Sequence, residues 1–310
     1  MMGVVRNKVI FCEGGSKSLD FQLINNRVLS NNITIIPVGG KFNFSLFIQA
    51  YFYIDKKKND ENNKKQNNEE NQKVTKKYII FRDRDFDIEP TSENKLLQID
   101  KLGNRAFLSH RTCIENYLLD PELIHQYWIT KYEEQLENPI SKWGHKDSPG
   151  VDKITQWIEE AAKNLQDYQA VRWALGNLCQ LSASRKHLDT SWTKDTIPDS
   201  LDLSHCKSQA LSLIHDFKNT VAEVTIDKFE ESLYRYLQLF NQQEFWQQKH
   251  YLIWFNGKDI YKAMHKISQD KTRPYKSYIS MDKFSKWAVN NIDITQHPDL
   301  IELRNKIEQL

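Results

Sequence analysis

Residues 78–87 read YIIFRDRDFD, and this stretch decides both the predicted fold and the predicted chemistry. Its first four residues form a short apolar run with β-branched and aromatic side chains, which is typical of a buried strand. Asp83 and Asp85 follow, and residues two apart at a strand end project to the same side. Two carboxylates so placed repel each other, and Mg²⁺ or Mn²⁺, which favour oxygen ligands, would relieve that repulsion. The alternative is an ordinary acidic loop that Arg82 and Arg84 neutralise.

Two earlier apolar runs predict further strands of the same sheet, Lys8–Cys12 (KVIFC) and Ile33–Val38 (ITIIPV). Helical spacing follows the first run at residues 19–28, behind serines that can cap a helix, and follows the second at residues 41–51. This strand–helix–strand–helix–strand order predicts the α/β class, with a parallel sheet and flanking helices.

Glu13 comes directly after the first strand and before the glycine pair Gly14 and Gly15. In a parallel sheet this place is the carboxyl edge, where ligands collect. The glycines allow a tight turn and the close approach of a phosphate to backbone N–H groups at a helix start. A glutamate here is also typical of a surface turn, but with Asp83 and Asp85 at another strand end of the same sheet it favours a metal site.

The bulk composition is that of an ordinary globular protein of 310 residues with a formal net charge of +2. Total charge therefore does not mark a nucleic-acid-binding protein, although a local basic patch could serve. The cysteines form no CxxC pair, which disfavours a zinc site and predicts buried, reduced thiols at Cys12, Cys113, Cys179 and Cys206. The sequence shows no signal-peptide pattern and no apolar run that could cross a bilayer, so we expect a cytoplasmic protein without membrane contact.

The remainder of the chain divides into a charged insertion and a helical half. Residues 55–77 are almost entirely Lys, Asn, Asp, Glu and Gln, which predicts a disordered surface insertion rather than a basic arm that grips phosphates. The sequence predicts two domains: residues 1–125 are the α/β domain, and residues 126–310 are a mostly helical domain for dimerisation, partner binding or substrate binding. A strand is expected there only at Tyr251–Phe255 (YLIWF). Helices are expected at residues 151–181, 206–224, 229–249, 258–267, 284–292 and 300–310.

The order strand–Glu13–Gly14, then Val38-Gly39-Gly40-Lys41, then strand–Asp83-x-Asp85 resembles the TOPRIM domain of topoisomerases, primases and OLD-family nucleases. The glutamate and the DxD pair are the signature of that family. The resemblance implies that residues 1–125 form a TOPRIM, Rossmann-like metal-binding catalytic domain. The charged insertion departs from a minimal TOPRIM domain, but it falls in a connection between the motif strands.

Two more segments are similar to an OLD-like TOPRIM group that includes the nuclease effectors of the PARIS anti-phage system. Residues 114–118 (IENYL) match its Ile-Glu-Asn-Tyr-Leu element, and residues 256–259 (NGKD) match its late Gly-Lys element. The resemblance implies that Glu115 adds a carboxylate for a second metal ion and that Lys258 is an active-site lysine. Two ions, Mg²⁺ or Mn²⁺, would then be held by Glu13, Asp83, Asp85 and Glu115.

Lysine and arginine side chains near these carboxylates are the candidates for contact with phosphate. A lysine places a point charge where negative charge accumulates during phosphodiester cleavage, with Lys258 as the first candidate and Lys41 as the second. The predicted substrate-binding set is Gly14, Gly15, Lys17, Gly40, Lys41, Arg84 and Arg111. His110 either reaches phosphate or is a buried, hydrogen-bonded residue. Asp87 either supports the metal ligands from outside the coordination shell or caps a helix, and the helix cap is favoured.

By resemblance, the expected function is a metal-dependent nuclease that cuts nucleic acid, with transfer RNA favoured over DNA, as the toxic effector of an anti-phage defence system. The resemblance also implies a homodimer when active and an ABC-type ATPase partner, since this chain has no GxxxxGK[ST] pattern of its own. Topoisomerase or primase chemistry is less favoured, because no tyrosine context marks a nucleophile and no template-binding module is visible. The alternative outside enzymes is a non-catalytic, metal-binding regulatory subunit of an ATPase complex.

Overall fold

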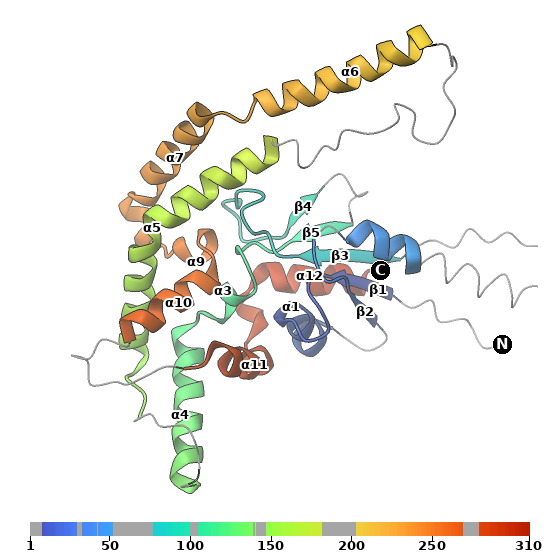
Figure 1. Cartoon of the computed structure of the whole chain (residues 1–310). Coiled ribbons are helices and arrows are strands. Elements are labelled where there is room, and N and C mark those ends of the chain that lie inside the picture. Colours follow the sequence, from blue (N-terminus) through green and yellow to red (C-terminus); the bar gives the residue numbers. More distant parts are fainter. Residues whose placement is uncertain are drawn as a thin grey trace, which may run out of the picture. The chain divides into compact units, whose positions relative to one another are not determined.

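Five strands form one mostly parallel sheet in the order β2-β1-β3-β5-β4 (Figure 1). The strands are β1 (Lys8–Cys12), β2 (Ile33–Pro37), β3 (Tyr78–Arg82), β4 (Leu97–Ile99) and β5 (Ala106–Leu108). β1 is central and pairs in parallel with both β2 and β3, and only β4 runs antiparallel to its neighbour. Cys12 is the register partner of both Pro37 and Phe81, so the chain leaves β1, β2 and β3 at one edge of the sheet. The predicted α/β class is confirmed.

This computed structural model describes residues 8–29, 33–41, 43–51, 77–99, 105–138, 140, 147–181, 203–268 and 279–310. The predicted insertion at residues 55–77 lies outside these ranges, apart from Lys77. The chain forms two compact units. The sheet unit comprises residues up to 85, 89–163 and 251–310, and the helical unit comprises residues 86–88 and 164–250.

The core of the sheet unit follows from the alternation of side chains along the strands. Val9, Phe11, Ile80 and Ala106 form one buried cluster with Val38 and with Phe44 of a helix at residues 44–51. Phe107 follows Ala106 and so points to the opposite face, where the Lys306 ammonium lies 4.9 Å from its ring centre. Helices therefore cover both faces of the sheet.

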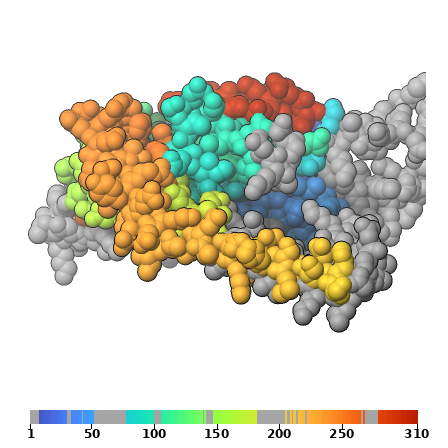
Figure 2. All heavy atoms as spheres, turned by 90° about the horizontal axis from the view of Figure 1, so that it is seen from above, coloured from blue at the N-terminus to red at the C-terminus, as the bar shows by residue number. Residues whose placement is uncertain are grey.

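The helices of the sheet unit come from widely separated parts of the sequence. They are α1 (Leu19–Leu23) with its π-helical continuation η1 (Ile24–Val28), the helix at 44–51, α3 (Glu115–Leu118), α4 (Pro121–Glu137), the first part of α5 (Val151–Leu181), α9 (Tyr251–Trp254), α10 (Gly257–Ser268), α11 (Met281–Asn291) and α12 (Pro298–Glu308). Ser18 caps α1 by accepting a hydrogen bond from the Phe21 N–H, as expected from a serine at that position. The Glu302 carboxylate of α12 accepts a hydrogen bond from the Leu96 N–H, and Figure 2 shows α12 alongside this segment.

The helical unit is built around aromatic side chains. It contains residues 86–88, the later part of α5, α6 (Leu203–Ala222), α7 (Ile226–Phe240) and α8 (Gln243–Gln247). Buried Trp173 of α5 contacts Phe86 on one side and Tyr236 of α7 on the other, with ring centres 5.2 and 5.6 Å apart. The stack continues from Tyr236 to Phe240 and then to Phe245 of α8.

Two features of the fold differ from the sequence-based expectations. Residues 251–255 are helical at Tyr251–Trp254 rather than a strand, because the carbonyls of Leu252, Ile253 and Phe255 accept hydrogen bonds from side chains instead of from a neighbouring strand. The compact units also do not follow the predicted boundary near residue 125, since residues 126–163 and 251–310 belong to the sheet unit. Within the described ranges, no helix combines the length and the apolar character required to span a bilayer.

Candidate active site

The turn after β1 places Glu13 at the carboxyl edge of the sheet. Gly14 adopts a φ of +79°, and a Cβ there would lie 2.5 Å from Ser18, so the turn requires glycine. The carbonyl of Gly14 accepts a hydrogen bond of 2.7 Å from the Gly39 N–H, which fixes the β1 turn against the end of β2. A Cβ on Gly15 or Gly40 would meet nothing within 4 Å, so of the three predicted substrate-binding glycines these two have open space beside them and Gly14 does not.

Asp20 is a further carboxylate at this edge that the sequence analysis missed. It lies in the first turn of α1, and its Oδ1 is buried and accepts no hydrogen bond from the described residues. Burial, reinforced by the negative charges of Glu115 and Glu13, raises the pKa of Asp20 to about 7. An acidic residue in a first helical turn is ordinary because it complements the helix dipole, so the pattern alone gave no reason to single it out.

Asp83 occupies the centre of the acidic group. It is buried at 8% relative exposure, and its Oδ1 accepts a hydrogen bond of 3.1 Å from the Ile114 N–H. Its pKa is raised well above the ordinary value, first by burial and then by the negative charges of Asp20, Glu115 and Asp85. The strand end and the segment before α3 therefore meet, as the motifs predicted.

Glu115 begins α3 and is paired with Lys258 at the start of α10. The Lys258 Nζ lies 3.4 Å from the Glu115 Oε1, and the Glu115 side chain is only 10% exposed. Burial alone would lower the pKa of Lys258, but the negative charge of Glu115, helped by neighbouring acidic groups, outweighs it and raises the pKa. Lys258 is therefore a firmly protonated cation next to the carboxylates, as the Gly-Lys motif implied.

Asn116 explains how a lysine more than 140 residues away comes to Glu115. Its Oδ1 accepts hydrogen bonds from the N–H groups of Cys113 and Gly257, and its Nδ2 donates to the carbonyls of Leu252 and Phe255. A Cβ at Gly257 would lie only 2.6 Å from the Asn116 backbone nitrogen. The asparagine and the glycine thus hold the start of α10 directly against α3.

The Asp85 side chain is partly open to solvent, with 36% of its surface exposed. Its Oδ2 lies 3.5 Å from the Lys41 Nζ, which brings the second predicted lysine to the site. Asp85 adopts a φ of +52°, an uncommon conformation that aspartate tolerates better than most residues. Its N–H donates a hydrogen bond of 2.8 Å to the Thr112 carbonyl, which ties the DxD segment to the loop before α3.

These carboxylates fit a divalent cation by their chemistry. Asp83 is buried and Asp20 is half-buried, with too little positive charge nearby to neutralise them, and the buried Asp20 Oδ1 without a hydrogen-bond partner among the described residues is an oxygen that a cation would satisfy. Across the described part of the chain, no three Asp, Glu, His or Cys side chains stand close enough together to hold an ion as they lie. Side-chain rotation would be needed to close a coordination shell.

Several other predicted residues have structural rather than substrate-facing positions. Arg84 is fully buried, and its guanidinium donates to the carbonyls of His110 and Ile253 and to the Thr112 hydroxyl, so its place does not fit the predicted contact with substrate. Arg111 donates to the Asn116 carbonyl, and its guanidinium lies 5.0 Å from the Tyr117 ring centre.

Three more predicted positions have separate outcomes. His110 is buried, and its N–H donates to Asp299, in agreement with the buried alternative. Lys17 is exposed, which is compatible with the predicted contact with a substrate phosphate. Asp87 lies in a bend and caps no helix, so the helix-cap interpretation of Asp87 was wrong.

The described cysteines are not metal-ligand candidates. Cys12 and Cys113 are buried and free, as predicted, and burial raises the pKa of Cys12 to about 12. The Cys113 thiol donates a hydrogen bond to the Asn116 Oδ1. Cys179 is exposed, contrary to prediction, and the side chain of Cys206 lies outside the described residues.

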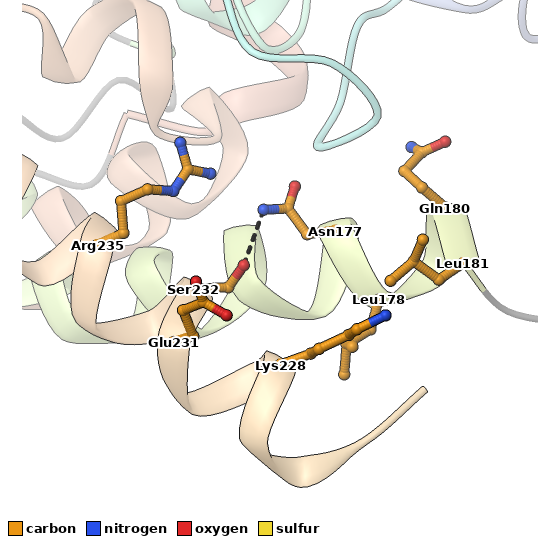
Figure 3. Close-up of a pocket in the computed structure, with 8 residues that line it drawn as sticks. All are labelled: Asn177, Leu178, Gln180, Leu181, Lys228, Glu231, Ser232 and Arg235. Carbon is orange, nitrogen blue, oxygen red and sulfur yellow. Dashed lines mark hydrogen bonds between the residues drawn. The ribbon is translucent and has the colours of Figure 1, made fainter. Parts of the chain in front are cut away.

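The helical unit contains a separate pocket of about 450 Å³ between α5 and α7 (Figure 3). Its lining is Asn177, Leu178, Gln180, Leu181, Lys228, Glu231, Ser232 and Arg235. Asn177 donates a hydrogen bond to Ser232 across it, and Glu231 is the only carboxylate among the lining residues. This composition offers no set of ligands for a metal ion.

No protein-family model and no curated protein matches this chain. The resemblance to TOPRIM and OLD-like proteins therefore rests on the motif residues themselves.

Proposed function

We propose that this chain is a Mg²⁺- or Mn²⁺-dependent nuclease that hydrolyses phosphodiester bonds in nucleic acid, built on a TOPRIM domain. The observation that carries the proposal is that Asp20, Asp83 and Glu115, from three distant segments, influence one another's charge: burial and then the negative charges of neighbouring carboxylates raise the pKa of Asp20 and of Asp83. A buried, mutually repelling group of carboxylates is a poor stabilising element, and perturbed pKa values of this kind cluster at functional sites.

The residues divide into those that would hold the metal and those that would meet the phosphate. The carboxylates that would hold one or two ions are Glu13, Asp20, Asp83, Asp85 and Glu115. When bound, the ions supply an activated water and stabilise the leaving oxygen. Lys258 and Lys41 keep positive charge at the two ends of this group, where a phosphate developing negative charge is stabilised. The open space beside Gly15 and Gly40 leaves their backbone accessible to a phosphate.

The substrate and the biological setting follow from the resemblance alone. The IENYL and Gly-Lys elements resemble those of AriB, the nuclease subunit of the PARIS anti-phage system. We propose transfer RNA in preference to DNA, a toxic role in phage defence in the cytoplasm, control by an ABC-type ATPase partner and a homodimeric active form.

The test is cleavage of transfer RNA and plasmid DNA by the purified chain, with Mg²⁺ or Mn²⁺ against EDTA. Asp83→Asn and Glu115→Gln should abolish cleavage while the circular dichroism spectrum stays unchanged. Glu93→Gln is the matched control, because Glu93 is an exposed carboxylate of the same unit that pairs with Lys95, and it should retain full activity.

Two results would count against the nuclease. One is the absence of metal-dependent cleavage of either substrate, both by the chain alone and after release from its ATPase partner. The other is full activity in Asp83→Asn. Metal binding without cleavage would instead support the regulatory subunit of an ATPase complex.

A further inference from the structure

The DxD segment continues directly into a segment that packs within the helical unit. Phe86–Ile88 follows Asp85 without a break, and these three residues belong with residues 164–250 rather than with the sheet. The peptide bond between Asp85 and Phe86 is therefore one of the covalent points at which the two units join, and it lies directly beside the DxD motif. The Asp85 carbonyl and the Phe86 N–H belong to one planar peptide unit, so a displacement of the Phe86 backbone changes the backbone dihedral angles available to Asp85.

Phe86 is held on α5 by a contact that only glycine allows. A Cβ on Gly176 would lie 2.5 Å from the Phe86 carbonyl oxygen and 2.9 Å from the Phe86 Cβ, closer than real Cβ contacts. The first of these atoms belongs to the backbone, so a side-chain rotation could not relieve the clash. Glycine is otherwise among the least favourable residues for a helix interior, and α5 runs without interruption from Val151 to Leu181.

Further contacts from the same face of α5 fix this short segment. The Phe86 ring lies edge-on to Trp173, with ring centres 5.2 Å apart, and the Arg172 guanidinium lies 4.2 Å from the Phe86 ring centre. The Gln180 side chain donates a hydrogen bond of 2.6 Å to the Asp87 carbonyl. Gln180 also lines the pocket in Figure 3, where it extends from the later part of α5.

The backbone of Asp85 is thus held at its N–H and at the residue that follows it. Its own N–H is fixed to the Thr112 carbonyl in the sheet unit, and the following residue is fixed to α5 in the helical unit. The positive φ of Asp85, +52°, is a conformation of higher energy that persists only where the surroundings impose it.

We propose that Gly176 is a positioning residue for the active site: by admitting the Phe86 carbonyl against α5, it sets the backbone of Asp85 and hence the aim of the Asp85 carboxylate. The consequence is that the helical unit controls the geometry of the DxD motif without contributing a ligand. This inference rests on the proposed function for its consequence in cleavage, but its structural core is independent of metal.

The experiment compares Gly176→Ala with wild type and with Cys179→Ala, an alanine substitution at an exposed position of the same helix. In metal-free protein, amide hydrogen exchange of residues 85–88 should become about tenfold faster in Gly176→Ala and stay unchanged in Cys179→Ala. Titration with Mn²⁺, followed by electron paramagnetic resonance, should show an affinity about tenfold weaker in Gly176→Ala. If Gly176 had only a structural role, Gly176→Ala would change the melting temperature but leave the hydrogen exchange of residues 85–88 and the Mn²⁺ affinity unchanged.

Gln180→Ala provides a second variant should Gly176→Ala not fold, because it removes only the hydrogen bond to the Asp87 carbonyl. In Gln180→Ala, hydrogen exchange of residues 85–88 should also become faster and Mn²⁺ affinity weaker, each by less than in Gly176→Ala. The inference is overturned if exchange at 85–88 and Mn²⁺ affinity remain within twofold of wild type in every variant that folds. If wild type neither binds Mn²⁺ nor cleaves nucleic acid while the exchange contrast persists, the proposed function fails and the positioning role of Gly176 stands.

Discussion

Replacement of Asp20 by asparagine should stabilise the metal-free protein at neutral and alkaline pH. The pKa of Asp20 rises from 3.8 to about 7 on folding, mainly through burial and then through the charge of Glu115. A carboxyl group with a raised pKa is protonated in the folded chain while it ionises in the unfolded one, so it lowers stability as pH increases. The loss begins near pH 4, grows up to pH 7 and then levels off.

The size of this effect follows from the displacement of the pKa. A rise from 3.8 to about 7 corresponds to at most roughly 4 kcal/mol of lost stability above pH 7. Relaxation of the surroundings and loss of the favourable first-turn charge reduce the gain from asparagine, which we expect to be roughly 2 kcal/mol. For a protein of this size, that gain corresponds to an increase in melting temperature of roughly 3 °C.

The assay is thermal unfolding in EDTA at pH 5, 6, 7 and 8, read as the difference between Asp20→Asn and wild type. The difference is the useful quantity because burial lowers the pKa of His297 to about 4, which makes stability rise with pH between about 4 and 6.5 in both proteins alike. Asp152→Asn is the control, since Asp152 lies in the first turn of α5 and is exposed. A variant less stable than wild type at pH 8, or a difference that does not grow with pH, would refute the reasoning.

Three further substitutions test the contacts that assemble the site. Gly257→Ala would place a Cβ 2.6 Å from the Asn116 nitrogen and should destabilise the protein by about 1–3 kcal/mol, measured as a lower urea midpoint at unchanged slope. Arg84→Lys loses the hydrogen bonds of a fully buried guanidinium and should lower the free energy of unfolding by about 3 kcal/mol in the same assay. If Arg84 served only to contact substrate at the surface, the free energy of unfolding would stay unchanged. Lys258→Met should reduce metal-dependent cleavage about 100-fold without weakening Mn²⁺ binding, and equal activity would exclude Lys258 from the chemistry. Mn²⁺ affinity in this variant should be the same or tighter, because the metal no longer competes with an ammonium for Glu115.

The sequence could predict those parts of the molecule that depend on local pattern. Short apolar runs with β-branched residues predicted β1, β2 and β3, and their parallel pairing brings Glu13 and Asp83 out at one edge. β4 and β5 have only three residues each, too few for a period to be visible. The YLIWF run has the composition of a strand but is helical at Tyr251–Trp254, and periodicity cannot separate the two in so short an apolar segment.

The candidate site was predictable where a motif carried its own chemistry and not where a residue acts through tertiary contacts. Asp83 and Glu115 could be predicted as metal ligands because carboxylates at these motif positions are suited to binding a metal ion. Asn116 lies inside the same IENYL motif, yet its role depends on carbonyls near residue 253 that only the folded chain brings to it. Arg84 looked like a phosphate-binding residue because a surface arginine beside acidic residues has the same sequence appearance as a buried one.

Two lysines form ion pairs with predicted metal ligands of the acidic group. Glu115 is drawn toward Lys258 and Asp85 toward Lys41, so each end of the acidic group is partly neutralised by an ammonium while the buried centre, Asp83, is not. A divalent cation at the centre would give the carboxylates a stronger partner than either lysine, because it carries twice the charge and accepts several oxygen ligands. Each lysine released from its carboxylate would then be available to a phosphate. If the proposed metal binds there, the lysines and the metal would compete for one set of carboxylates, and metal loading and phosphate binding would favour each other.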